Sequence, residues 1–121
     1  MRMAELGYEG PPPIDSYGGG GFRVAGAFHS GHMIMFEQTP QAWEPGALEA
    51  AAFKSILDSA QDIDVMLVGM GGEIAPLPAA TRAALESAGI GVEVMATAAA
   101  CRTYNVLLAE ARRVAVALIA V

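Results

Sequence analysis

The sequence predicts an α/β fold in three layers, with a mixed central sheet built from parallel strand-helix-strand units and an N-terminal antiparallel β-hairpin. Three observations lead to this prediction. The chain has 121 residues, of which 54% are hydrophobic, enough for one domain with a substantial core. From Ile63 onward, short continuous apolar runs alternate with segments of helical spacing. Before them, two short apolar runs flank a glycine-containing turn.

The N-terminal residues are expected to lie outside this domain. Residues 1–13, MRMAELGYEGPPP, end in three prolines, which lack a backbone N–H and therefore hold few hydrogen bonds of regular structure. We predict a flexible arm over 1–13 and a single α/β domain over 14–121. The runs FRVAGAF and HMIMFE lie on either side of Ser30-Gly31, and glycine accepts the positive φ of a tight turn. These runs are expected to pair as the hairpin.

A first helix is predicted over residues 45–60, with Pro45 near its start. Its apolar side chains share one face at helical spacing: Leu48, Ala52, Phe53, Ile56 and Leu57. The next run, IDVMLVG, is continuously apolar, as in a strand covered on both faces. The pattern therefore changes from helix to buried strand.

Two strand-helix-strand units are predicted in tandem after this helix. Residues 78–89 begin with proline and end with glycine, which are helix start and stop signals. TAAACRTYNVLLAEAR forms the next helix, with Thr97 as its N-cap. Because helical crossovers join parallel strands, residues 63–69, 91–95 and 114–120 are predicted to be neighbouring parallel strands.

Charge and composition exclude several functions. Seven Lys and Arg against thirteen Asp and Glu leave a net charge of −6, which opposes binding to nucleic acid. The longest apolar run, VAVALIAV, is far shorter than the roughly 20 residues of a membrane-spanning helix. One cysteine forms no internal disulfide, and the N-terminus lacks the apolar run of a signal peptide. We expect a cytoplasmic protein with no nucleic-acid partner, no membrane insertion and no cofactor.

A candidate ligand or partner site lies where two parallel strands end. Gly69, Gly71 and Gly72 follow one strand and Thr97 follows the next, so these loops are expected to form a shallow pocket. The GMGG spacing matches neither the dinucleotide nor the P-loop fingerprint, and a simple connection explains it equally. Arg102 either adds a cation for an anion or carboxylate, or tethers the glycine loop through its carbonyls.

Three other features of the sequence are candidate sites. Cys101 lies near a helix start beside an arginine, which favours a reactive thiolate, but its alanine neighbours favour a buried, inert residue. His29 and His32 lack a third metal ligand nearby, so no metal is expected. Phe22 and Phe28 are predicted to present an apolar surface to a protein partner. No catalytic residue is assigned.

Four runs of the sequence resemble a known family: YGGGGFRVAG, IDVMLVGMGG, GIGVEVM and above all TAAACRTYNVLLAEARRVAVAL. They are similar to the small α/β domain family whose animal members include a mitochondrial assembly factor for respiratory complex I and an adipogenesis-associated protein. The resemblance covers roughly residues 14–121. Two departures are Ala96, where an acidic residue is expected, and Ala111, where glycine is expected.

The resemblance implies a three-layer domain with a mixed sheet and an assembly or binding role without an established reaction. We therefore expect a non-enzymatic binding or assembly module that assists assembly of a respiratory complex through a protein partner. The alternative is a small-molecule or anion binder, or an enzyme, that uses the loops near Gly71 and Thr97. Near Cys101 the sequence offers only Arg102, Tyr104 and Glu110 for proton transfer, which disfavours catalysis.

Overall fold

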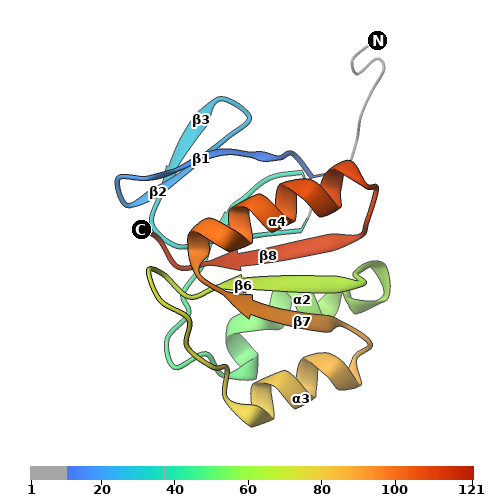
Figure 1. The fold of residues 1–121 in the computed structure, drawn as a ribbon. Helices are drawn as coiled ribbons and strands as arrows, with labels where there is room; N and C mark the ends of the chain where they lie inside the picture. The colour runs from blue at the N-terminus through green and yellow to red at the C-terminus, as the bar shows by residue number, and fades with distance from the viewer. Residues whose placement is uncertain (1–10, 37) are drawn as a thin grey trace.

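A five-stranded mixed sheet forms the centre of the protein, in a computed structural model that describes residues 11–36 and 38–121 (Figure 1). The strand order is β5, β4, β8, β6, β7. Strand β6 (Val65–Gly69) pairs in parallel with both β7 (Gly91–Met95) and β8 (Val114–Leu118). On the far side of β8, β4 (Met33–Met35) and then β5 (Gln41–Ala42) add antiparallel strands. The predicted trio of neighbouring parallel strands is confirmed.

Helices cover both faces of this sheet, which gives the predicted three layers. Figure 1 shows α4 (Thr97–Ala109) on one face, and α2 (Lys54–Asp58) and α3 (Ala79–Ser87) on the other. Short 3₁₀ turns, η1 (Ala50–Phe53) and η2 (Ala60–Asp62), flank α2. The crossover helices α3 and α4 therefore lie on opposite faces.

The first predicted helix is shorter than residues 45–60. Leu48 has a left-handed φ of 59°, and its carbonyl oxygen accepts a hydrogen bond from the Thr81 hydroxyl at 2.7 Å. The indole N–H of Trp43 donates to the carbonyl of Ala52 at 2.8 Å. These side chains bind carbonyls that a regular helix would pair with its own N–H groups, so the segment begins as a 3₁₀ turn.

The N-terminal hairpin forms at a different position from the predicted one. β1 (Ile14–Gly18), β2 (Gly21–Val24) and β3 (Ala27–Ser30) make a separate antiparallel sheet. The turn between β2 and β3 lies at Ala25-Gly26, where both residues have positive φ, 51° and 82°, as a two-residue hairpin turn requires.

The predicted pairing of FRVAGAF with HMIMFE around Ser30-Gly31 is therefore wrong. The second run instead supplies β4, which joins the central sheet beside β8. All three residues of β4 are buried, so this strand needs cover on both faces, and a hairpin at the surface offers cover on only one.

Two hydrophobic clusters lie on opposite faces of the central sheet. Along β8, Ala115 and Ala117 belong to the cluster under α2 and α3, whereas Val114, Val116 and Leu118 belong to the cluster under α4. This alternation is the period of two that a strand imposes. The small sheet contributes Ile14, Phe22 and Val24 to the second cluster, so it packs on the same side as α4.

Most of the predicted arm, residues 1–10, lies outside the described residues. Pro12 is described, and its carbonyl oxygen accepts a hydrogen bond from the Tyr104 hydroxyl at 3.0 Å. The described part of the chain therefore begins against α4. Within the described part of the chain, no helix is long and apolar enough to cross a membrane.

Candidate functional site

The structure brings Gly69, Gly71 and Thr97 together at the carboxyl ends of β6 and β7. The N–H of Gly71 donates to the Thr97 hydroxyl at 2.9 Å, and the N–H of Thr97 donates to the Gly71 carbonyl at 2.9 Å. The Thr97 hydroxyl in turn donates to the carbonyl of Ile119 at 2.7 Å. Three segments are thus joined by one buried hydroxyl. A ligand that used these groups would have to displace those bonds.

Close packing explains why the strand ends in glycine. A Cβ at Gly69 would lie 2.8 Å from Leu118 Cδ2 and 2.9 Å from Thr97 Oγ1. Gly71 has a φ of 90°, which L side chains rarely adopt, and Gly72 beyond it is exposed. Packing and backbone conformation therefore account for Gly69 and Gly71 without a ligand.

Thr97 is not the N-cap that the sequence indicated. The N-cap of α4 is Ala96, in an extended conformation, and Thr97 is the first helical residue. Thr97 is fully buried, and its hydroxyl is directed at neighbouring loops instead of at the helix's own N–H groups. The hydroxyl of Thr97 does bind backbone groups, as an N-cap would, but those groups belong to Gly71 and Ile119 and not to the first turn of α4.

Arg102 lies on the exposed side of α4 and points to the small sheet. Its Nη1 donates to the hydroxyl of Tyr17 at 3.3 Å. Among the described residues, this is the hydrogen bond that the Arg102 side chain makes, and none joins it to the carbonyls of the glycine loop. Arg102 therefore connects α4 with β1, a link that spans 85 residues of sequence.

The two phenylalanines predicted to share an apolar surface lie in different environments. Phe22 is fully buried in the cluster under α4 and cannot meet a partner, so this part of the prediction is wrong. Phe28 is 47% exposed on β3, opposite Arg23 of β2. Adjacent residues of a strand point to opposite faces, and across β2 from Phe28 the register places Ser16 of β1. Phe28 is therefore an exposed apolar side chain on the face of the small sheet opposite to that of Phe22.

Cys101 is buried, as predicted. Burial raises the pKa of its thiol to about 11, while the neighbouring charge of Arg102 acts in the opposite direction with a smaller effect. A thiol is nucleophilic as the thiolate, so this environment suits a core residue. Its reactivity remains a prediction.

The two histidines lie at different places relative to the strands: His29 is within β3 and His32 precedes β4. The ring Nδ1 of His32 accepts a hydrogen bond from the N–H of Ala120 at 3.0 Å. No group of three or more potential metal ligands occurs among residues 11–36 and 38–121.

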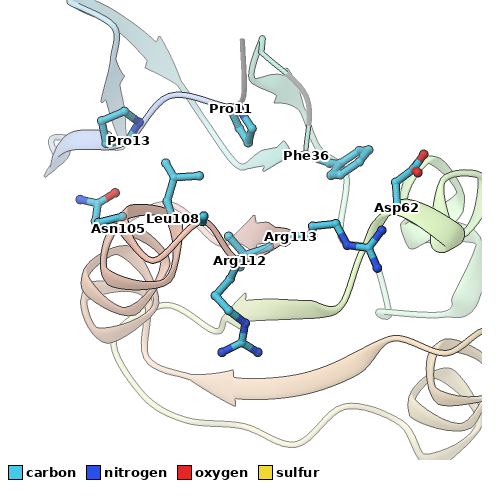
Figure 2. Close-up of a pocket in the computed structure, with 11 residues that line it drawn as sticks. Pro11, Pro13, Phe36, Asp62, Asn105, Leu108, Arg112 and Arg113 are labelled. Atoms are coloured by element: carbon cyan, nitrogen blue, oxygen red, sulfur yellow. The ribbon is translucent and has the colours of Figure 1, made fainter. Parts of the chain in front are cut away.

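A groove of about 630 Å³ lies at the C-terminal end of α4, where the sequence predicted no site. We call it the proline groove; Pro11, Pro13, Phe36, Leu108, Arg112 and Arg113 are part of its lining. Figure 2 shows Pro11 and Pro13 on one side and the end of α4 on the other. The groove joins elements that are distant in sequence, so no local pattern marked it.

The charged residues that line this mostly apolar groove differ in whether they form ion pairs. Arg113 pairs with Asp64, with Nη2 2.7 Å from Oδ1 and Nε 3.2 Å from Oδ2. Hydrogen bonding by the Arg113 side chain is the main reason why the pKa of Asp64 is lowered. Asp62 also lines the groove. The side chain of Arg112, by contrast, makes no hydrogen bond or ion pair with any residue that the structure describes and is exposed, although its charge contributes to the lowered pKa of Asp64.

A second feature that was not assigned a role is the Tyr-Asn pair of CRTYN. Tyr104 is fully buried and donates to Pro12, and the Asn105 side chain binds both backbone groups of Ile14. Cys101 and Asn105 are four residues apart and so share a helical face, but this local spacing does not show that the face holds the start of β1. These residues position the chain at the edge of the proline groove.

Comparison with known proteins shows relatives along nearly the whole chain. The family described as "Protein of unknown function (DUF498/DUF598)" matches residues 14–119. An uncharacterised protein of Rhodobacter capsulatus is 43% identical over 98% of this chain and 93% of its own length. The mouse protein named NADH dehydrogenase [ubiquinone] 1 alpha subcomplex assembly factor 3 is 32% identical over 88% of this chain. This chain spans 59% of that longer relative.

Solved structures show the same fold. A protein of Bartonella henselae, described as an outer membrane protein, has a TM-score of 0.87 and 38% identity, with 93% of this chain and 98% of that chain covered. A Bordetella pertussis protein described as a Mth938-like domain has a TM-score of 0.76 and 28% identity, covering 89% and 85% of the two chains. The mixed α/β architecture is therefore shared with experimentally determined relatives.

Proposed function

Because the chain belongs to the family of proteins of unknown function DUF498/DUF598, which matches residues 14–119, we propose that it is a non-enzymatic protein-binding module that assists assembly of a respiratory complex. The observation that supports this most is the 32% identity to the mouse assembly factor over 88% of the chain. The sequence similarity to the mouse protein therefore extends over most of this chain and is not confined to one motif.

The chemistry of the described residues supports a binding role over catalysis. The thiol of Cys101 is buried, and its pKa is raised to about 11, so it is protonated at neutral pH. The Thr97 hydroxyl is buried and engaged with two backbone groups. A nucleophile needs an accessible position and a nearby base, and neither side chain has the first of these.

The outer face of the small sheet is the partner surface that we propose. Phe28 lies there, 47% exposed, and its cross-strand neighbour Arg23 is exposed as well. An exposed aromatic ring beside an arginine combines two residue types that are enriched in protein interfaces. The proposed contact therefore has an apolar centre and a cation at its side.

Deletion of the gene in the organism that encodes it tests the assembly role. We expect less assembled NADH dehydrogenase on native gels and slower NADH oxidation by isolated membranes, while a second respiratory complex that does not contain NADH dehydrogenase stays at its normal level. The wild-type gene should restore both quantities. Normal levels of NADH dehydrogenase in the deletion strain would contradict the proposal.

Complementation with matched variants tests the surface. Phe28→Asp should fail to restore assembly, whereas Ile74→Asp should restore it, because Ile74 is 71% exposed on the loop between β6 and α3. Both variants replace an exposed apolar side chain with the same carboxylate. Thermal melting of each purified variant checks that it is folded. Equal restoration by both would reject the face that carries Phe28 while leaving the assembly role standing.

A further inference from the structure

The outer side of α4 carries an exposed apolar residue between two opposite charges. Val106 is 56% exposed, although it lies in a helix that buries its other side against the central sheet. Arg102 lies four residues before it and Glu110 four residues after it, and both are exposed. In Figure 1, α4 lies in front of the central sheet, and no described segment crosses its outer side. This surface is therefore accessible to another molecule.

The three residues share one side of the helix at equal spacing. Positions four apart in an α-helix lie on the same side, one turn above the other. Because each residue advances the axis by about 1.5 Å, Arg102 and Glu110 lie about 6 Å from Val106 in opposite directions. The surface therefore has a cation at one end, an apolar side chain at its centre and a carboxylate at the other end.

Neither charge is paired with an opposite charge in the described part of the chain. The Arg102 guanidinium donates to the neutral hydroxyl of Tyr17 at 3.3 Å, and its charge opposes the rise in the pKa of the Cys101 thiol. The Glu110 carboxylate makes no hydrogen bond or ion pair with residues 11–36 and 38–121. Since a guanidinium has five N–H groups, the bond to Tyr17 leaves others for a carboxylate.

We propose that the outer side of α4 is the contact surface of a weak homodimer, in which α4 of one copy packs antiparallel against α4 of a second copy. A two-fold axis at Val106 brings the two Val106 side chains together and places each Arg102 opposite the second copy's Glu110. A two-fold interface uses the same surface twice, so these three residues provide an apolar centre and two ion pairs. This inference goes beyond the role in assembly and concerns a different face from that of Phe28.

Charge decides the direction of the two helices. Parallel helices would bring Arg102 against Arg102 and Glu110 against Glu110, and like charges in contact are unfavourable. Antiparallel helices bring each charge to its opposite, which makes the surface complementary to itself. The occupant with matching chemistry is thus another copy of the same helix.

The dimer is expected to be weak. Water screens exposed ion pairs, and the net charge of −6 on each copy opposes their approach. One helix side is also a small interface, of the kind found in transient complexes. We expect a dissociation constant of about 0.1 to 1 mM. The protein is then monomeric at micromolar concentration.

Sedimentation and NMR of the full chain, from micromolar to millimolar concentration, test the dimer. Sedimentation should show a monomer that converts to a dimer as the concentration rises. In the NMR dilution series, the amide signals of Arg102, Val106 and Glu110 should shift with concentration. The signal of Ile74, also exposed but on the loop between β6 and α3, should stay constant.

Charge reversal tests the pairing. Arg102→Glu and Glu110→Arg, each alone, place like charges opposite each other twice and should weaken dimerisation about tenfold or more. The double variant exchanges the charges in both copies and should restore the dimer. An equimolar mixture of the two single variants should also associate, because each chain then supplies the charges that the other lacks.

Two further variants control for the change in net charge. Arg23→Glu and Glu73→Arg make the same changes at exposed positions on β2 and on the loop after β6. They should alter dimerisation far less than the changes on α4. Thermal melting at micromolar concentration checks that every variant is folded.

Four results would overturn the proposal. A protein that stays monomeric in the millimolar range would remove the homodimer. Stronger association of Arg102→Glu would indicate that like charges meet, as in parallel helices. Failure of the mixed single variants to associate would remove the pairing of Arg102 with Glu110. Concentration-dependent shifts confined to another surface would place the contact away from α4.

Discussion

Asn105 on α4 holds the first residue of β1 by both of its backbone groups. The Asn105 Oδ1 accepts from the N–H of Ile14 at 2.8 Å, and the Asn105 Nδ2 donates to the carbonyl of Ile14 at 2.9 Å. The two residues are 91 positions apart in sequence. One amide side chain thus imitates a neighbouring strand and ties the small sheet to the helix.

Asn105→Ala should lower the free energy of unfolding by about 1 to 3 kcal/mol, because it leaves two partly buried backbone groups without partners. Urea unfolding measures this change. Val106→Ala, at the exposed neighbouring position, is the control and should change stability by less than about 0.5 kcal/mol. Equal effects at the two positions would show that the Asn105 bonds contribute nothing specific.

Thr97→Val should destabilise the protein by about 1 to 3 kcal/mol. Valine keeps the shape, but the N–H of Gly71 and the carbonyl of Ile119 lose their bonds to the buried hydroxyl. Thr97→Ser keeps the hydroxyl and should cost only about 1 kcal/mol, the value of one buried methyl group. Thermal melting ranks the variants, and a serine variant less stable than the valine variant would refute the role of the hydroxyl.

Ala111→Gly should raise stability by up to about 1 kcal/mol. Ala111 follows α4 with a φ of 61°, and the N–H of Arg112 returns to the carbonyl of Leu107 at 3.0 Å, as in a glycine-type helix end. An L side chain makes this left-handed conformation unfavourable, and glycine removes that strain. Ala109→Gly, still within the helix, should instead lower stability by about 1 kcal/mol. Chemical denaturation of both variants should therefore show opposite signs.

The thiol of Cys101 should react slowly while the protein is folded. Its pKa rises from 9.0 to about 11, so at pH 8 the folded chain holds about a hundred-fold less thiolate than the unfolded chain. Modification by an aromatic disulfide reagent, followed by absorbance with and without urea, measures the two rates. Labelling of the folded protein near the unfolded rate would refute the prediction.

The same shift makes stability depend on pH in a defined window. Because the pKa is raised in the folded state, this contribution to stability is complete below pH 9.0 and is lost as the pH rises toward about 11. Cys101→Ala lacks this titration. Its stability should approach that of the wild type as the pH rises through this window, and a constant difference would contradict the burial of the thiol.

The sequence by itself determined the parallel half of the fold. The apolar runs at β6, β7 and β8 are each long enough for one buried strand, and the proline and glycine signals bound α3 between them. These signals are local, and helical crossovers leave parallel pairing as the favoured arrangement. The burial of Cys101 followed from its alanine neighbours in the same local way.

Only the tertiary structure decided which partners the N-terminal half would take. Met33, Ile34 and Met35 form a strand as expected, but their place beside β8 depends on the cover that distant elements supply. Phe22 and Phe28 have the same side chain, and packing against α4 buries one and leaves the other exposed. The proline groove arises where Pro11, Phe36 and Leu108 meet, so it exists only after long-range contacts form. Local propensity acts over a few residues, whereas burial and hydrogen-bond partners are set by contacts that close long loops, and a single sequence does not display those contacts.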